Sequence, residues 1–198
     1  MKIGNLGVGF GLDSNGFIVS DVSEDKIGDV YITCIQASVV GLKRLFRQQL
    51  NSVYVYGSVA RGEAIVKKSD LDLIALFDTK LSSVKLSGLK KLAEELSRNY
   101  RSLVRDVGIA VAYYDDTVTP SNYYENAFLK ELCVCMYGED LGERFGPYKL
   151  TSEIAICFNG DIYEALKRTL KRLETASKIL KYLHKASLVN SFEHTIQW

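Results

Sequence analysis

Hydrophobic and polar residues repeat along this chain with two different periods, which divide it into predicted helices and strands. From Ser23 to residue 47 the apolar positions return every three or four residues, which predicts a long amphipathic helix with Ser23 as its N-cap. Helical spacing also marks residues 86–100, 121–132 and 162–183. Runs of β-branched and aromatic residues predict strands over residues 53–56, 71–77 and 103–113.

The order of these elements is typical of a sheet domain with flanking helices. Helix, strand, turn, strand, helix and strand follow one another, which predicts an α/β or α+β fold with helices on one side of the sheet. The periodicity is poor over residues 142–160, where Gly146-Pro147 predicts a turn. We therefore expect one domain over residues 1–145 and a C-terminal helical region over residues 146–198.

The composition indicates a globular protein and disfavours a general nucleic-acid binder. Of the 198 residues, 47% are hydrophobic and 25% are charged, which is too apolar for a disordered chain. The net charge is only +1, so the chain lacks the strong positive field of nucleic-acid binders. The last predicted helix does have a basic face that could bind RNA or a triphosphate. Because no aromatic residues are interleaved with its lysines, a solvated face is the favoured interpretation.

No segment of the sequence is predicted to enter a membrane. No apolar run reaches the ~18 residues of a membrane span, and the first residues lack the pattern of a signal peptide. The 4 cysteines contain no CxxC pair and are expected to be buried thiols. We therefore expect a cytoplasmic protein without a membrane partner.

Asp70 and Asp72 are the strongest candidates for chemistry. Residues two apart in a strand point to the same face, so the predicted strand brings both carboxylates together. Two like charges ~4 Å apart repel by about 4 kcal/mol at an effective dielectric of ~20, unless a cation or a proton neutralises them. Carboxylate oxygens favour Mg²⁺ or Mn²⁺. A divalent metal site at Asp70 and Asp72 follows, although an isolated Asp-x-Asp is more often exposed or structural.

A Gly-Ser turn precedes the two aspartates. Gly57 ends a predicted strand and would let the backbone approach a phosphate closely, and a helix starting there would direct its N–H groups at that anion. Ser58 adds a hydroxyl donor, and Arg61 or Lys67 could contact a triphosphate. A Gly-Ser pair alone is usually only a turn, so the signal lies in its order and spacing relative to Asp-x-Asp.

The sequence resembles the polymerase-beta-type nucleotidyltransferase superfamily, whose signature is a Gly-Ser turn followed about a dozen residues later by Asp-x-Asp. Two segments carry the resemblance, Gly57-Ser58-Val59-Ala60-Arg61-Gly62-Glu63-Ala64 and Ser69-Asp70-Leu71-Asp72-Leu73. It implies a mixed sheet with flanking helices plus a C-terminal helical region, as in small adenylyltransferases and aminoglycoside nucleotidyltransferases. The loop over residues 65–68 departs from the pattern, since it is one residue longer and lacks the usual proline. Phosphate placement near Lys67 and Lys68 therefore stays open.

The resemblance also implies a mechanism and a third carboxylate. The family has an acidic residue on a neighbouring strand, and Asp106 is the candidate in the predicted strand over residues 103–113. The reaction implied is transfer of a nucleoside monophosphate, AMP from ATP, to a hydroxyl of an acceptor, with pyrophosphate leaving. Asp70 and Asp72 would bind two Mg²⁺ ions, with Mn²⁺ as a substitute. Asp106 would bind one of them and accept the acceptor's proton, and Ser58 would hold the β- and γ-phosphates.

The acceptor is not determined by the sequence. Residues 137–141, Tyr-Gly-Glu-Asp-Leu, resemble a segment that follows the catalytic domain in antibiotic-modifying adenylyltransferases and in minimal stand-alone members. The C-terminal helices of such proteins complete the nucleotide or acceptor pocket, which suggests that role for residues 161–186. An aminoglycoside-like small molecule therefore competes with a protein or an RNA end as acceptor.

A protein without catalytic activity is the alternative from a different class. A binding module or antitoxin-like partner could keep the fold and the nucleotide site. The last residues, 192–198, are apolar for a free tail. They indicate packing on the protein, contact with a second copy or a protein partner, or a chain that continues beyond Trp198.

Overall fold

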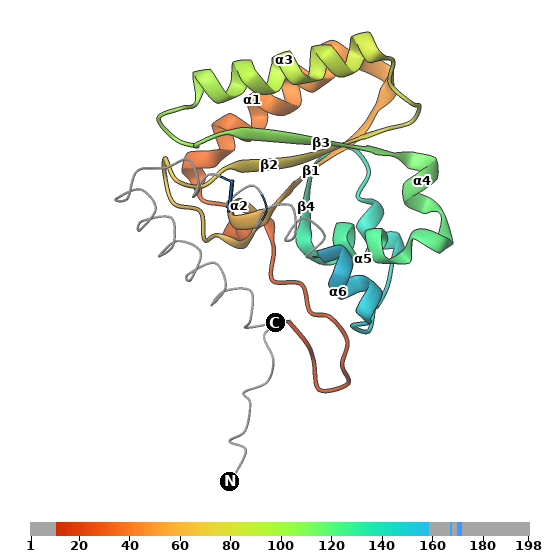
Figure 1. The fold of residues 1–198 in the computed structure, drawn as a ribbon. Helices are drawn as coiled ribbons and strands as arrows, with labels where there is room; N and C mark the ends of the chain where they lie inside the picture. The colour runs from red at the N-terminus through yellow and green to blue at the C-terminus, as the bar shows by residue number, and fades with distance from the viewer. Residues whose placement is uncertain (1–10, 159–166, 168–169, 172–198) are drawn as a thin grey trace. The chain divides into compact units, whose positions relative to one another are not determined.

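The computed structural model describes residues 11–158, 167 and 170–171 (Figure 1). The chain divides into two compact units. One is formed by Ser20–Pro147, and the other by the segments before and after it. The domain boundary between residues 145 and 146 remains a prediction.

The larger unit is built on a four-stranded mixed sheet. Its strands are β1 (Leu50–Tyr56), β2 (Leu71–Phe77), β3 (Val107–Tyr113) and β4 (Cys133–Tyr137), and they lie in the order β3-β2-β1-β4. β1 is antiparallel to both β2 and β4, whereas β2 and β3 are parallel. The predicted fold class, a mixed sheet with flanking helices, is confirmed.

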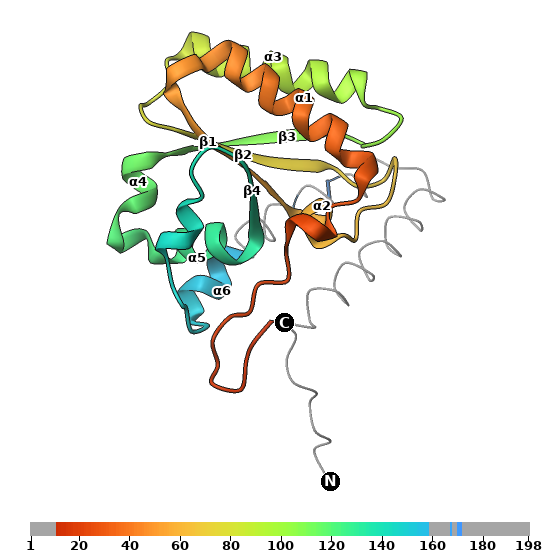
Figure 2. The ribbon, with the colours of Figure 1, turned by 180° about the vertical axis from the view of Figure 1, so that it is seen from behind.

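Two long helices cover one face of the sheet. α1 (Asp29–Phe46) and α3 (Ser83–Asn99) lie side by side on this face, as both views show (Figures 1 and 2). Alternate β2 residues pack beneath them, and these are completely buried: Leu71, Leu73, Ala75 and Phe77. A Cβ atom on Gly41 of α1 would lie 2.7 Å from Leu92 of α3, so glycine lets the helices approach closely. This main core fixes the position of β2.

The opposite face carries a smaller core, so the expectation of helices on one side only is wrong. Three helices follow β3, namely α4 (Tyr114–Val118), η3 (Pro120–Asn122) and α5 (Tyr123–Leu132), and η4 (Leu141–Arg144) follows β4. Of these, α5 lies on this face (Figure 2). The buried side chains here are Tyr54, Leu76, Leu129, Cys133 and Leu141. Both sheet faces are therefore covered by helices, but not along the whole length of β2 and β3.

Several element boundaries differ from the prediction, and one strand was not predicted. Ser23 precedes a 3-10 turn, η1 (Glu24–Lys26), and makes no side-chain cap bond, while α1 begins after Gly28. β3 begins at Val107, because residues 103–106 form the connection from α3. β4 follows α5 directly and was not predicted, since no turn signal separates them. Two further short helices are η2 (Arg47–Gln49) and α2 (Gly57–Arg61).

The second unit is described over a smaller part of its length. An isolated bridge joins Leu12 and Ile18, and another joins Phe17 and Lys149. α6 (Ser152–Phe158) is its one helix with described bounds. Most of the predicted helix over residues 162–183 lies outside the described residues. In the part of the chain that is described, no helix is long and apolar enough to span a bilayer.

Tyr54 ties the segment after β4 to the centre of the sheet, which gives a stability prediction. Its buried hydroxyl donates to the carbonyl of Glu139 (3.0 Å) and accepts from the N–H of Leu141 (2.9 Å). Burial raises the pKa of Tyr54, so the hydroxyl keeps its proton. Tyr54→Phe leaves both groups without this partner and is expected to lower the free energy of unfolding by about 1–3 kcal/mol in urea titrations. Tyr124→Phe on α5 is the control and should change it by less than about 0.5 kcal/mol.

Candidate active site

The predicted site residues lie where the end of β1 meets the beginnings of β2 and β3. Asp72 pairs with Tyr56 of β1 on one side and with Gly108 of β3 on the other. Since Asp72 is on the face opposite the main core, it shares that face with Ile74 and Leu76. Leu76 is completely buried, Asp72 is half-buried and Gly108 is exposed. This end of the smaller face is therefore open to solvent.

Gly57 makes the turn from β1 into α2 directly beside Asp72. Its φ of +73° is in the left-handed region that disfavours any residue with a side chain. A Cβ atom at this position would lie 2.8 Å from Oδ2 of Asp72. The positive φ favours glycine here, and the absence of a Cβ atom lets the Asp72 carboxylate lie close to the Gly57 backbone.

Ser58 and Arg61 lie on the short helix α2 that follows this turn. The helix ends at Gly62, whose φ is +77°, and the carbonyl of Ser58 accepts the N–H of Glu63 (2.9 Å). Nε of Arg61 lies 3.1 Å from Oε2 of Glu63, in an exposed ion pair. The structure thus places Ser58 next to the Gly57 turn. It pairs Arg61 with Glu63, two residues further along the chain.

The longer loop over residues 65–68 is closed by its own hydrogen bonds. Ser69 Oγ accepts the N–H of Ile65 (2.9 Å), and Lys67 has a φ of +65° with its N–H bonded to the carbonyl of Leu103 (2.7 Å). The side chain of Lys67 is exposed. The loop therefore needs no proline to keep its shape, and it aligns the entry to β2 with the segment that precedes β3.

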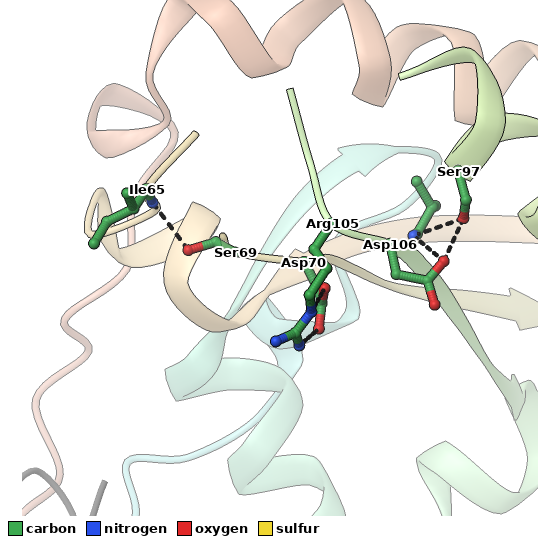
Figure 3. A network of polar contacts seen from close by, with 7 residues as sticks. Ile65, Ser69, Asp70, Ser97, Arg105 and Asp106 are labelled. Atoms are coloured by element: carbon green, nitrogen blue, oxygen red, sulfur yellow. Dashed lines mark hydrogen bonds and ion pairs between the residues drawn. The ribbon is translucent and has the colours of Figure 1, made fainter. Parts of the chain in front are cut away.

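Asp70 is bound by an arginine that the sequence analysis did not assign to the site. Nε of Arg105 donates to Oδ1 of Asp70 (2.9 Å), and Nη2 of Arg105 donates to Oδ2, so the pair is bidentate (Figure 3). This hydrogen bonding raises the pKa of Arg105, and the charges of Asp70, Asp106 and Asp72 raise it further, against a lowering by burial. Arg105 therefore lies within the electrostatic field of all three predicted carboxylates.

The carboxylate of Asp106 is directed elsewhere. Its Oδ1 accepts from Oγ of Ser97 on α3 and from the N–H of Val107 (2.9 Å). Figure 3 shows Asp106 turned toward Ser97, whereas Asp70 and Arg105 face each other. Among the described residues, no three histidine, cysteine, aspartate or glutamate side chains are grouped closely enough to hold a metal ion. Asp106 as third ligand remains a prediction that requires its side chain to turn.

Asp70 and Asp72 nevertheless fit a divalent cation. Both donors are carboxylate oxygens, which hard ions such as Mg²⁺ prefer. The space beside Asp72 is kept free of side-chain atoms by Gly57 and Gly108, whose Cβ atoms would lie 2.8 Å and 3.4 Å from its oxygens. Asp70 already binds a cation, the guanidinium of Arg105. The site therefore has the donors, the room and the negative charge for a metal ion.

Arg105 could have been found from the register of the sheet. The N–H of Arg105 donates to the carbonyl of Ser69, and the N–H of Leu71 donates to the carbonyl of Asp106, both at 2.9 Å. These bonds extend the parallel β2–β3 pairing by two residues and bring Arg105 beside Asp70. The sequence signal was an arginine directly before the candidate third aspartate, but its use requires the strand pairing.

A comparison with known protein families finds one match within the chain. Residues 41–122 match the family model described as "Nucleotidyltransferase domain", and this range contains the Gly57 turn, Asp70, Asp72 and Asp106. Over this part, which is less than half of its length, the chain is similar to nucleotidyltransferase domains. No curated protein matches the chain by sequence.

Solved structures that are similar to this chain include an adenyltransferase. Spectinomycin adenyltransferase AAD(9) from Enterococcus faecialis, with ATP and spectinomycin, is 14% identical with a TM-score of 0.51, covering 74% of this chain and 69% of that one. A toxin-antitoxin structure with AMP-PNP is 15% identical (TM-score 0.37; 67% and 91% covered). A tri-AMPylated HEPN toxin with MNT antitoxin, from Shewanella oneidensis, is 12% identical (TM-score 0.35; 69% and 93%). At 14% identity, the similarity to the adenyltransferase shows that the two chains share a fold and shows nothing about function.

The two glycines beside Asp72 are expected to differ in their tolerance of a methyl group. Gly57→Ala combines left-handed strain of about 1–2 kcal/mol with a forced shift of Asp72, and is expected to lower the free energy of unfolding by that amount or more. Gly108→Ala has no positive φ and an ordinary contact, so a change within about 0.5 kcal/mol is expected. Urea unfolding of both variants checks this. Equal losses would show that the Gly57 turn is not constrained as described.

Proposed function

We propose that this protein transfers AMP from ATP to a hydroxyl group of an acceptor, with Mg²⁺ held by Asp70 and Asp72. The observation that carries the proposal is the Asp72 carboxylate, which lies at the open end of the sheet against the backbone of Gly57. Asp70, the residue before β2, lies two positions before Asp72, and side chains at this spacing in an extended chain point to the same side. The nucleotidyltransferase domain match over residues 41–122 supports this chemistry.

The chain's own residues bind and orient the triphosphate. The backbone of Gly57 and the hydroxyl of Ser58 are proposed to bind the β- and γ-phosphates, because both lie at the turn that adjoins Asp72. Arg61 and Lys67 would supply positive charge from the surrounding loop, and for Arg61 this means leaving Glu63. When bound, Mg²⁺ would neutralise negative charge on the α-phosphate and on the departing pyrophosphate.

The reaction also needs a group that takes the proton of the acceptor hydroxyl. The acceptor oxygen forms a bond to the α-phosphorus, the bond from that phosphorus to the bridging oxygen breaks, and pyrophosphate leaves with the electron pair. Asp106 is the proposed base, since it precedes β3 next to the β2 aspartates. To act, it must exchange its hydrogen bond with Ser97 for one with the acceptor.

A small hydroxylated molecule is the acceptor class that we favour. The similar structure with a TM-score of 0.51 is a spectinomycin adenyltransferase with ATP and spectinomycin. The overall charge of +1 gives no general attraction to an RNA acceptor. We propose on these grounds that an aminoglycoside-like compound, rather than a nucleic acid, receives AMP.

Binding of ATP is expected to depend on divalent metal and on the two β2 aspartates. Calorimetry should show ATP binding with Mg²⁺ that is lost without the ion and lost in the Asp70→Ala/Asp72→Ala double variant. AMP transfer should fall on the order of 10²–10³-fold in Asp72→Ala alone, as for loss of a group that stabilises developing charge. Asp78→Ala, just after the other end of β2, is the matched control and should bind ATP normally. Unchanged binding in the double variant would exclude this metal site.

The acceptor is expected to be identified by transfer of labelled AMP. Label from α-³²P-ATP should appear on a member of an aminoglycoside and aminocyclitol panel, and not on total RNA. If the label appears instead on a protein of the cell lysate, the acceptor is a protein and the small-molecule assignment is wrong. If ATP binds but no panel, RNA or lysate component is labelled, a non-catalytic nucleotide-binding module is the better description.

A further inference from the structure

We propose that Arg105 is a resident counter-cation of the site, which competes with the divalent metal for Asp70 and so lowers the affinity for the free ion. This inference rests on the proposed metal site at Asp70 and Asp72. It assigns a role to a residue outside the Gly57–Ala64 and Ser69–Leu73 segments. Arg105 acts here through Asp70 and is thus a positioning residue.

The geometry makes the guanidinium and a metal ion alternatives at Asp70. Arg105 uses Nε and Nη2 to occupy Oδ1 and Oδ2, so both oxygens of Asp70 already accept a charged donor. A metal ion prefers the same lone pairs of these oxygens and repels a cation held there. Full coordination by Asp70 therefore requires Arg105 to withdraw.

The backbone around Arg105 and Asp70 is held by hydrogen bonds, whereas the Arg105 side chain is exposed. Hydrogen bonds from Arg105 N–H to Ser69 and from Leu71 N–H to Asp106 hold the two segments together. The Arg105 side chain is 68% exposed, while that of Asp70 is 26% exposed, so the cation covers the carboxylate from the solvent side. Arg105 can therefore swing into water with little loss of packing, whereas Asp70 stays in place.

The charges around Arg105 explain why its guanidinium is held at Asp70. Asp70, Asp72 and Asp106 all contribute to the raised pKa of Arg105, with the Asp70 hydrogen bond as the largest cause. The carboxylates outnumber the guanidinium, so the site stays net negative and still attracts a divalent ion. Arg105 thus sets how strongly that ion is held rather than whether the site accepts it.

The test is titration with Mn²⁺ alone, followed by electron paramagnetic resonance, with no nucleotide present. Arg105→Gln is expected to lower the Kd for Mn²⁺ about 2- to 10-fold, the size of effect expected for loss of one partly exposed bidentate pair. Arg105→Lys, which keeps the charge but loses the planar fork, should give a smaller change. Arg101→Gln, an exposed arginine on the same connection, should leave the Kd unchanged.

The outcomes separate this inference from the proposed function. An unchanged or weaker Mn²⁺ affinity in Arg105→Gln, with binding still lost in Asp70→Ala/Asp72→Ala, would overturn the role of Arg105 alone. Wild-type affinity in the aspartate double variant, or no binding in wild type and Arg105→Gln, would overturn the metal site and this inference with it. In an Asp70→Asn background the effect of Arg105→Gln should disappear, because the competition acts through Asp70. If Arg105→Gln still lowered the Kd for Mn²⁺ in the Asp70→Asn background, the change would come from the overall charge of the site, and the proposal would be contradicted.

Discussion

The placement of Asp72 against the Gly57 backbone, at an uncovered end of the sheet, is the constraint on which the site depends. A carboxylate buried further along β2, where Leu76 is completely buried, would lose its hydration without compensation. At the open end it keeps contact with solvent and with any cation that solvent carries. Gly57 can make its left-handed turn only because it lacks a Cβ atom. The turn and the carboxylate therefore constrain each other.

The two faces of β2 divide the tasks of stability and chemistry. Leu71, Leu73, Ala75 and Phe77 on one face are completely buried under α1 and α3, which anchors the strand along its whole length. The other face begins with Asp72, next to Asp70 just before the strand, and continues with the apolar residues of the smaller core. A strand held this firmly on one side can present charged groups on the other with little freedom to relax. The repulsion between these groups must then be met by a cation rather than by movement of the strand.

Local patterns predicted the centre of the fold but not its margins. β2 and the Gly57 turn were predictable, because alternation, strand-forming residues and glycine act within a few residues. β4 was missed because Cys133–Tyr137 continues from α5 without a turn residue, and its strand conformation comes from pairing with β1. The second layer of helices was missed for the same reason, since the smaller core forms only when distant segments meet. Arg105 and Ser97 could not be predicted as site residues from the sequence, because their positions depend on the parallel register of β2 and β3.

Asp70 and Asp106 are each held by a polar partner from a neighbouring segment. Arg105 binds Asp70 and Ser97 binds Asp106. These partners reduce the repulsion that three neighbouring carboxylates would otherwise cause, and they stabilise the folded domain without a metal ion. At the proposed metal site, the same contacts would have to be exchanged for coordination bonds before an ion is fully bound. An ion that arrives with the phosphates of a nucleotide would bring further ligands of its own, whereas a free ion would not. The proposed site would therefore bind metal and nucleotide together more readily than the metal alone.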